Sequence, residues 1–516
     1  MAVVGGVVTD LAFPGTGWWP LAFVGVALLL LAMGRDSAWW NALVGFVWGL
    51  AFFGPQLSWI DGAVGWVPWI ALCVAEAGFV ALFGVGWSWA RRGRVIRTAA
   101  RWQVPAAAVL WVAVEEARSV LPYGGFPWGR LAFSQADSPL GRLAWLGGVP
   151  LVSAAVVVVG ALLAVAVQRV RELELGMASG AVLLGFAVLA GGLVVPLDTA
   201  AEDGHLEVAA VQGDVPDRGL DSLDQARQVV VNHANGSMSL LERVEPGQLD
   251  LLLWPENSAD FDPRTDAETR ALVDKVTTSL DVPLLLGTQE YPDTGGRYNL
   301  GMLWEPGVGP VAIYAKQHPV PFAEYIPMRS IARRFSSAVD RVGRDMLAGT
   351  EVGLIPVNVP RLGRTVGVAD VICFEVAYDD IVRDAVTAGG ELLVVQTNNA
   401  TFGHTDESTQ QLAMSQIRAM ELGRATVQIS TVGVSGIIAP NGTVMQRTDL
   451  FTAEQMVASV PLRTSLTPAA RIGDEVGWAL RGLGVVVVLA GVAGAWGSRR
   501  ESGTDRARRG ARATAR

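Results

Sequence analysis

Eight long runs of apolar residues constrain this chain more than any other feature of its sequence. Seven of them precede residue 200 and one follows residue 470, and most come near the roughly twenty residues that a helix needs to cross a bilayer. The residues from about 205 to 465 instead alternate polar and apolar side chains, as a soluble domain does. We therefore predict a polytopic α-helical membrane domain of about eight transmembrane helices and one globular domain, with spans at 2–13, 18–33, 40–58, 63–89, 104–120, 142–167, 176–196 and 474–497.

The first apolar run is short, and it has neither a basic segment before it nor a small-residue cleavage site after it. We interpret it as a tilted or partly inserted first helix and not as a removed signal peptide. The prediction divides the chain into a seven-helix membrane domain at 1–200, a globular domain at 201–465, and a final span with a basic tail at 466–516.

Arginine-rich segments indicate how the spans are oriented, because cationic loops stay in the cytoplasm. The dense segments are 91–101, 168–172 and 498–516. If the amino terminus lies inside, eight crossings put all three segments and Arg35 on the cytoplasmic side. The same count places the globular domain on the extracytoplasmic face.

The formal net charge of −9 at pH 7 argues against a nucleic-acid partner, because a protein that binds phosphate backbones needs a basic face. The basic tail is better placed to contact anionic lipid. Only two cysteines occur, Cys73 in an apolar run and Cys373 in the globular domain, so we expect no disulfide. The four histidines lie far apart with no cysteine cluster near them, and we predict neither a metal site nor a cofactor.

Lysine is rare enough in this chain to be informative. The 40 basic residues include only Lys275, on a polar predicted helix, and Lys316, which follows the apolar strand "VAIYA". A codon bias toward arginine explains the scarcity, but it does not explain why one site kept lysine. A compact ammonium can stabilise a developing oxyanion or share a proton with a carboxylate, whereas a guanidinium stays protonated.

Two other residues end apolar strands, Glu256 in "LLLWPENS" and Cys373 in "VADVICFEVAYDD". Each has an ordinary explanation, since acids at strand ends are common and a lone cysteine is often a small buried hydrophobe. A helix predicted to begin near Glu375 favours the nucleophile interpretation, because its amino-terminal field would lower the pKa of the thiol.

Glutamate, lysine and cysteine at three strand ends form a set of base, electrostatic stabiliser and nucleophile. The set resembles that of the nitrilase (carbon–nitrogen hydrolase) superfamily, and the resemblance covers roughly 205–465. It implies an α/β fold with an α-β-β-α sandwich. In that fold Cys373 would be the nucleophile, Glu256 the general base, and Lys316 the stabiliser of the tetrahedral intermediate.

The whole chain resembles one branch of that superfamily, the bacterial apolipoprotein N-acyltransferases. Its sequence is similar to their motifs in "VEEARSVLPYGGFPWGRLAFSQ", "WPENS", "YAKQHPVPFAEYIP", "CFE", "QLAMSQIRAMELGR" and "TVGVSGIIAPNG". The chain departs from the family where Phe374 replaces a frequent tyrosine and where "TNNATFG" replaces "NDAWFG". These departures put details of lipid contact in doubt, but not the chemistry.

The resemblance also implies further site residues. Two supporting acids fall on Glu324 and Glu375, and for Glu375 charge compensation at a helix amino terminus remains an alternative. Arg130 could hold phosphate or could pair with nearby acids such as Glu115. The residues expected to contact substrate are Phe374, Asn399, Phe402, Trp128 and Arg130.

The expected function is transfer of an acyl chain from a glycerophospholipid, through a cysteine thioester, to the amino-terminal amine of a diacylglyceryl-cysteine in lipoproteins. The expected setting is a monomer in the bacterial cytoplasmic membrane. Two alternatives remain open from the residues alone: a membrane-tethered nitrilase or amidase that uses water, and a noncatalytic lipoprotein-binding protein.

Overall fold

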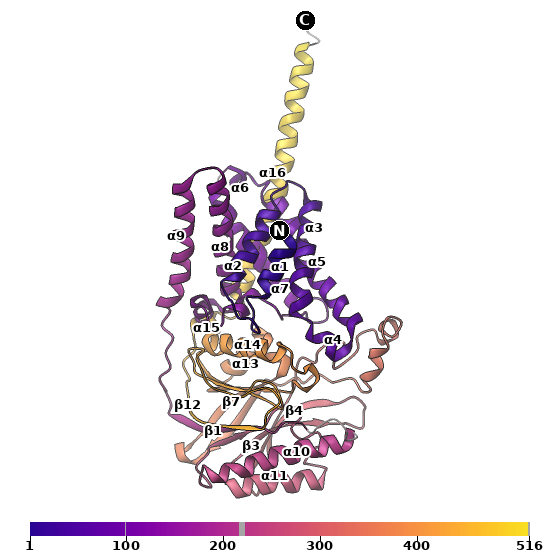
Figure 1. The fold of residues 1–516 in the computed structure, drawn as a ribbon, viewed down its shortest axis with the longest axis vertical. Helices are drawn as coiled ribbons and strands as arrows, with labels where there is room; N and C mark the ends of the chain where they lie inside the picture. The colour runs from indigo at the N-terminus through magenta and orange to yellow at the C-terminus, as the bar shows by residue number, and fades with distance from the viewer. Residues whose placement is uncertain (99, 216–221, 514–516) are drawn as a thin grey trace.

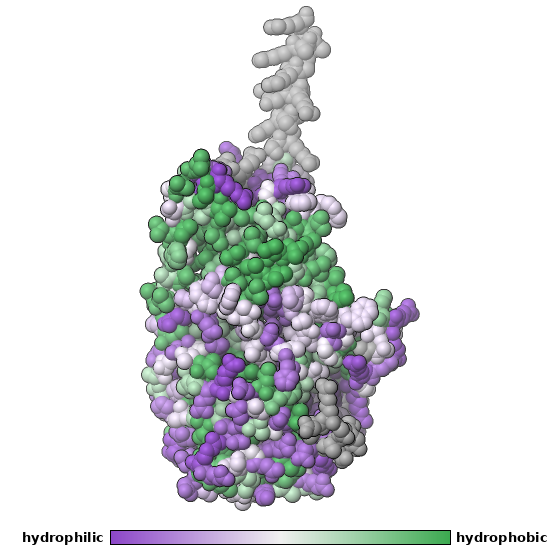
Figure 2. Space-filling view, in the orientation of Figure 1, coloured by the Kyte–Doolittle hydropathy of each residue, from purple (hydrophilic) through white to green (hydrophobic). Residues whose placement is uncertain are grey.

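The computed structural model describes residues 1–98, 100–215 and 222–513 of the chain. A bundle of helices forms one end of the molecule, and two sheets with flanking helices form the other (Figure 1). The longest helix, α16, runs along the bundle and continues beyond it at the end away from the sheets. Figure 2 shows a hydrophobic band over the bundle and a mostly hydrophilic surface over the sheets.

Each predicted apolar run contains a helix of the bundle. The helices are α1 Ala2–Asp10, α2 Leu21–Ala32, α3 Ala38–Gln56, α4 Trp59–Val64, α5 Trp66–Ala90, α6 Arg94–Thr98, α7 Gln103–Val120, α8 Ala144–Arg171, α9 Leu175–Gly191 and α16 Glu475–Ala513. Four helical segments among the described residues are long and apolar enough to cross a membrane: Trp66–Ala90, Pro139–Arg171, Leu175–Val194 and Glu475–Trp496. The count of eight crossings stays a prediction, and α1, about 14 Å long, is too short to cross alone.

Glycines allow helices α3 and α5 of the bundle to pack closely. A side chain on Gly45 of α3 would lie 2.4 Å from the carbonyl oxygen of Val80 on α5. A side chain on Gly84 of α5 would lie 2.2 Å from the carbonyl oxygen of Asn41. Van der Waals contact between backbones is a main source of helix association in lipid, so these positions are closed to larger residues.

The globular domain contains two six-stranded sheets, and most of their strands are buried along nearly their whole length. The first sheet has the order β12-β1-β2-β3-β4-β5 and the second β11-β10-β9-β8-β7-β6. The strands are β1 His205–Gln212, β2 Leu251–Leu253, β3 Leu284–Glu290, β4 Tyr298–Glu305, β5 Gly309–Ala315, β6 Leu354–Val359, β7 Arg364–Ile372, β8 Leu392–Thr397, β9 Ala425–Ser430, β10 Gly436–Ile438, β11 Val444–Arg447 and β12 Glu454–Pro461.

Neighbouring residues of a strand point to opposite faces, so each sheet buries both of its faces. In β1, Leu206 and Val208 lie between the two sheets, whereas Ala209 and Val211 pack beneath the outer helices. Helices cover both outer faces (Figure 1). On the first sheet they are α10 Ser222–Met238 and α11 Ala267–Leu280, and on the second α13 Asp379–Thr387 and α14 Glu407–Leu422. The predicted α-β-β-α layering is confirmed.

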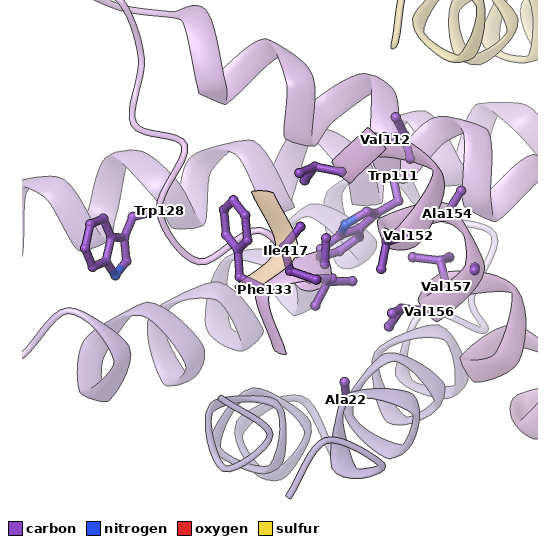
Figure 3. Close-up of a cluster of buried hydrophobic side chains, with 14 of the residues drawn as sticks. Ala22, Trp111, Val112, Trp128, Phe133, Val152, Ala154, Val156, Val157 and Ile417 are labelled. Atoms are coloured by element: carbon purple, nitrogen blue, oxygen red, sulfur yellow. The ribbon is translucent and has the colours of Figure 1, made fainter. Parts of the chain in front are cut away.

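Helix α14 joins the globular domain to the helical bundle. Nearly all of its residues are buried, because one face packs on the second sheet and another on the bundle. Figure 3 shows its Ile417 in one cluster with Trp111, Phe133 and Val152 of the bundle. One hydrophobic cluster therefore extends across both domains.

A buried group of ion pairs crosses the same joint. The guanidinium of Arg130 lies 2.7 Å from Asp379 and also pairs with Glu116. The guanidinium of Arg418 lies 2.7 Å from the other oxygen of Asp379 and also pairs with Glu421. Asp379 thus binds one arginine from the bundle and one from α14, which fixes the start of α13 against the membrane domain.

We expect Arg418→Met to lower the melting temperature of the detergent-solubilised protein by about 5–10 °C. The change leaves buried carboxylates without their partner, and breaking a buried pair costs about 3–5 kcal/mol. Arg333→Met is the control, because both members of its pair with Asp340 are more than half exposed and such pairs contribute little. Equal melting temperatures for the two variants would contradict a stabilising role for the joint.

Candidate active site

The structure brings Glu256, Lys316 and Cys373 together from three strand ends. Glu256 follows β2, Lys316 follows β5, and Cys373 follows β7 of the opposite sheet. The ammonium of Lys316 lies 3.8 Å from Oε1 of Glu256, and the thiol of Cys373 is close enough to the same carboxylate for the two groups to affect each other's pKa. A carboxylate, an ammonium and a thiol therefore lie together between the rims of the two sheets.

The carboxylate of Glu256 is buried and held from two sides. Its Oε1 accepts a hydrogen bond of 2.5 Å from the side-chain amide of Asn299, and its Oε2 accepts one of 2.8 Å from the backbone N–H of Asn398. Burial raises the pKa of Glu256 above its usual value, although the nearby Lys316 ammonium acts in the opposite direction. A carboxylate in this environment is a stronger proton acceptor than one in water.

Lys316 is fully buried between two carboxylates. Its ammonium donates a hydrogen bond of 2.6 Å to Glu324, whose second oxygen accepts the backbone N–H of Val320 at 2.7 Å. Burial alone would lower the pKa of Lys316, but Glu324 and Glu256 outweigh burial and hold the pKa above its usual value. The side chain is therefore a fixed positive charge beside the thiol.

Glu375 clamps the lysine loop to the cysteine turn. Its carboxylate accepts backbone hydrogen bonds of 2.8 Å from Ile372, 2.7 Å from Gln317 and 3.1 Å from His318. It also accepts the hydroxyl of Tyr314 at 2.9 Å. Because these donors come from two segments of opposite sheets, Glu375 does more than compensate charge at one helix end.

The turn at Cys373 differs from the sequence-based expectation. Residues Cys373–Ala377 form a short 3-10 turn, α13 begins only at Asp379, and Cys373 has a left-handed φ of 57°. The predicted helix field is therefore missing, and burial together with the Glu256 carboxylate raises the pKa of the thiol despite Lys316. A thiol with a raised pKa needs a base to remove its proton before it can act as a nucleophile. The left-handed backbone at Cys373 is strained, and strain of this kind is typical of functional sites.

An aromatic group extends from the cysteine turn to the helical bundle. The ring of Phe374 stacks on Trp128 with centroids 5.4 Å apart and an interplanar angle of 9°. Trp59 lies 5.3 Å from Trp128 and 5.0 Å from Phe402. Three of the residues expected to contact substrate therefore lie together beside the nucleophile.

The two polar residues expected to contact substrate have protein partners instead. Arg130 is 1% exposed and lies among the carboxylates of the joint. Asn399 is 2% exposed, its amide nitrogen donates to Glu407 and Gln411, and its oxygen accepts from Ser430. For Arg130 the structure shows the alternative of pairing with nearby acids, among them Glu115 and Glu116. Substrate contact by either residue stays a prediction.

Sequence reasoning missed Asn299, Glu407 and Gln411. For Glu407 and Gln411 the available signal was their spacing of four positions, which places them on one face of a helix. That helix proves to be buried, so these polar side chains need partners inside the protein. Within the described parts of the chain, no group of three or more His, Cys, Asp or Glu side chains is placed to hold a metal ion.

Two family models match successive parts of the chain. A family model described as the apolipoprotein N-acyltransferase N-terminal domain matches residues 5–162, and one described as carbon-nitrogen hydrolase matches residues 208–467. Among solved structures, an amidase from Nesterenkonia sp. is similar with a TM-score of 0.39 and 15% identity, over 54% of this chain and 97% of that chain.

Curated relatives match over most of the sequence. An apolipoprotein N-acyltransferase from Mycolicibacterium smegmatis is 37% identical over 95% of this chain and 84% of its own length. One from Pseudomonas aeruginosa is 29% identical over 95% of this chain and 94% of its own length. With both domains matched in order, this chain belongs to the apolipoprotein N-acyltransferase family and carries a carbon–nitrogen hydrolase domain.

Proposed function

We propose that this chain is an apolipoprotein N-acyltransferase. It moves an acyl chain from a glycerophospholipid to Cys373, and from Cys373 to the amino-terminal amine of a diacylglyceryl-cysteine in lipoproteins. The observation that carries the proposal is that Glu256 and Lys316 lie together with the Cys373 thiol beside the helical bundle. Membership of the family supports the same activity.

In the first transfer, Glu256 accepts the proton of the Cys373 thiol, and the sulfur attacks an ester carbonyl of the phospholipid. A sulfur–carbon bond forms, and the negative charge that develops on the carbonyl oxygen is stabilised by the Lys316 ammonium. The carbon–oxygen bond then breaks. The proton held by Glu256 passes to the leaving lysophospholipid, so a thioester remains on the enzyme.

In the second transfer, the lipoprotein amine attacks the thioester carbonyl while Glu256 accepts a proton from that amine. A nitrogen–carbon bond forms, the sulfur–carbon bond breaks, and the thiolate of Cys373 leaves and recovers its proton from Glu256. The same three groups therefore serve both transfers, and the products are an N-acylated lipoprotein and the free enzyme.

The proposed setting is the cytoplasmic membrane of a bacterium, with the protein as a monomer and the sheet domain on the extracytoplasmic face. In support, Arg91 donates a hydrogen bond of 2.7 Å to the carbonyl of Arg35, so two cationic loops lie together. The segment α6 beside them lies at the end of the bundle away from the sheets (Figure 1). The proposed division remains a membrane domain at 1–200, a catalytic domain at 201–465, and a final span with its tail at 466–516.

The strongest test is mass spectrometry of the purified protein after incubation with phospholipid vesicles. We expect a mass increase of one acyl group, which hydroxylamine removes because it cleaves thioesters. Cys373→Ser should show no thioester, and Cys73→Ser, the matched control, should behave as the wild type. An acyl-enzyme that water discharges as readily as a lipoprotein peptide would favour the amidase alternative, and no acyl-enzyme at all would favour the binding protein.

The two lysines provide a matched pair of variants. We expect Lys316→Arg to reduce acyl-enzyme formation by about 100-fold or more and to lower the melting temperature. Its site is fully buried between two carboxylates, so a larger guanidinium overpacks it. Lys275 lies at an exposed position of α11, so Lys275→Arg should change neither acyl-enzyme formation nor the melting temperature. Retained acylation in Lys316→Arg would contradict the need for a compact ammonium.

The pH dependence of kcat/KM should report the state of Glu256. A general base works only when it is unprotonated, so activity should fall as pH falls through the pKa of Glu256. Since burial raises that pKa, the midpoint of the acid limb should lie above 4.5, the ordinary value for a glutamate. Melting curves at each pH separate this loss from unfolding. A midpoint at or below 4.5 would contradict the assignment of the base.

A further inference from the structure

A buried chain of side-chain hydrogen bonds ends at the sulfur of Cys373. It runs from Glu407 through Asn399 to Gln411, and these side chains are 2%, 2% and 0% exposed. Glu407 and Gln411 are one helical turn apart on α14, and Asn399 lies in the loop after β8. None of the three has a part in the two transfers described above.

Ser430 fixes the donor-to-acceptor direction of this chain of hydrogen bonds. The hydroxyl oxygen of Ser430 accepts the backbone N–H of Gly433 at 2.8 Å, and its hydrogen points to Oδ1 of Asn399 at 2.5 Å. The amide nitrogen of Asn399 must therefore face the other way. It donates to Oε2 of Glu407 at 2.7 Å and to Oε1 of Gln411 at 3.0 Å.

The orientation of Gln411 follows from that of Asn399. Its Oε1 accepts the Asn399 amide and also lies 2.9 Å from the hydroxyl of Thr397. Its Nε2 is consequently turned toward Sγ of Cys373, 3.9 Å away, which is within the range of hydrogen bonds to sulfur. A rotated amide would place its oxygen toward the sulfur and its nitrogen toward the donor groups of Asn399, which is unfavourable.

We propose that Gln411 is a further catalytic residue, whose side-chain amide donates a hydrogen bond to the thiolate of Cys373, and that Asn399 and Glu407 are positioning residues for it. The inference rests on the proposed function. A donor at this point stabilises the sulfur when it loses its proton to Glu256 and again when it leaves the thioester. Hydrogen bonds to the charged form of a group favour that form.

The charges around the thiol explain why a neutral donor is useful. Burial and the carboxylate of Glu256 oppose thiolate formation, the ammonium of Lys316 favours it, and no helix field assists at this turn. Burial also raises the pKa of Glu407 to about 8, so near neutral pH this acid is largely uncharged and repels the thiolate little. Its Oε2 can accept from Asn399 whether or not the other oxygen carries a proton.

The test measures alkylation of Cys373 by iodoacetamide as a function of pH, in the full-length protein in detergent. The rate is read by mass spectrometry on the peptide that contains Cys373, which separates it from Cys73. We expect Gln411→Leu to move the pH midpoint of alkylation upward by about one unit and to slow the reaction about tenfold below that midpoint. Asn399→Leu, which removes the group that orients Gln411, should shift the midpoint in the same direction.

Gln416→Leu is the matched control. Gln416 is buried on the same helix and donates to Asp137 and to the carbonyl of Gly442, away from the sulfur. Gln416→Leu should lower the melting temperature about as much as Gln411→Leu does, without moving the pH midpoint of alkylation. A melting curve shows whether each of Gln411→Leu and Asn399→Leu folds. If a variant that folds has an unchanged pH midpoint of alkylation, the proposal is overturned. Alkylation requires no phospholipid, so a shifted midpoint without any acyl-enzyme in the wild type would overturn the proposed function and leave this inference standing.

Discussion

The ammonium of Lys316, buried between the carboxylates of Glu256 and Glu324, is the interaction on which the site depends. An ammonium buried away from water is stable only beside carboxylates that compensate its charge. Each buried carboxylate is in turn stabilised by the cation. In the proposed first step the thiol of Cys373 gives its proton to Glu256, so negative charge moves from the carboxylate to the sulfur but its total does not change. Proton transfer therefore avoids most of the cost of creating a new charge in a poorly solvated place.

Glu256, Lys316 and Cys373 meet only because the two sheets are held in a fixed position relative to each other. Glu256 and Lys316 come from the first sheet, whereas Cys373 comes from the second. Glu375 bonds to the lysine loop and to the end of β7, so its carboxylate ties the two rims together where the thiol faces the base. A shift of either sheet would break these bonds before it separated the reacting groups. Glu375 thus acts on the geometry of the site and not on its chemistry.

The sequence predicts the parts of this structure that local patterns determine, and fails where tertiary contacts decide. Glu256, Lys316 and Cys373 are recognisable because each ends an apolar strand, and strand ends gather at a rim. The helix expected near Glu375 is a short turn instead, since the left-handed backbone at Cys373 ends the strand abruptly. The pairing of Arg130 with acids near it in the sequence is an alternative that the sequence leaves open, and Glu115 and Glu116 do lie beside it. Its pairing with Asp379, 249 positions along the chain, depends on how α13 docks, and no local sequence pattern predicts that contact.

The shared core between α14 and the bundle gives the proposed reaction its physical setting. Both acyl-bearing substrates keep their chains in the bilayer, while the thiol sits at a sheet rim. Both substrates react at the same sulfur, so the reacting group of each must come into near contact with the atoms there. Helix α14 fixes the position of the thiol relative to the bundle, because its Ile417 packs in the bundle while its Gln411 faces the sulfur. The helix that anchors the catalytic domain to the membrane domain therefore also carries a group that orients toward the nucleophile.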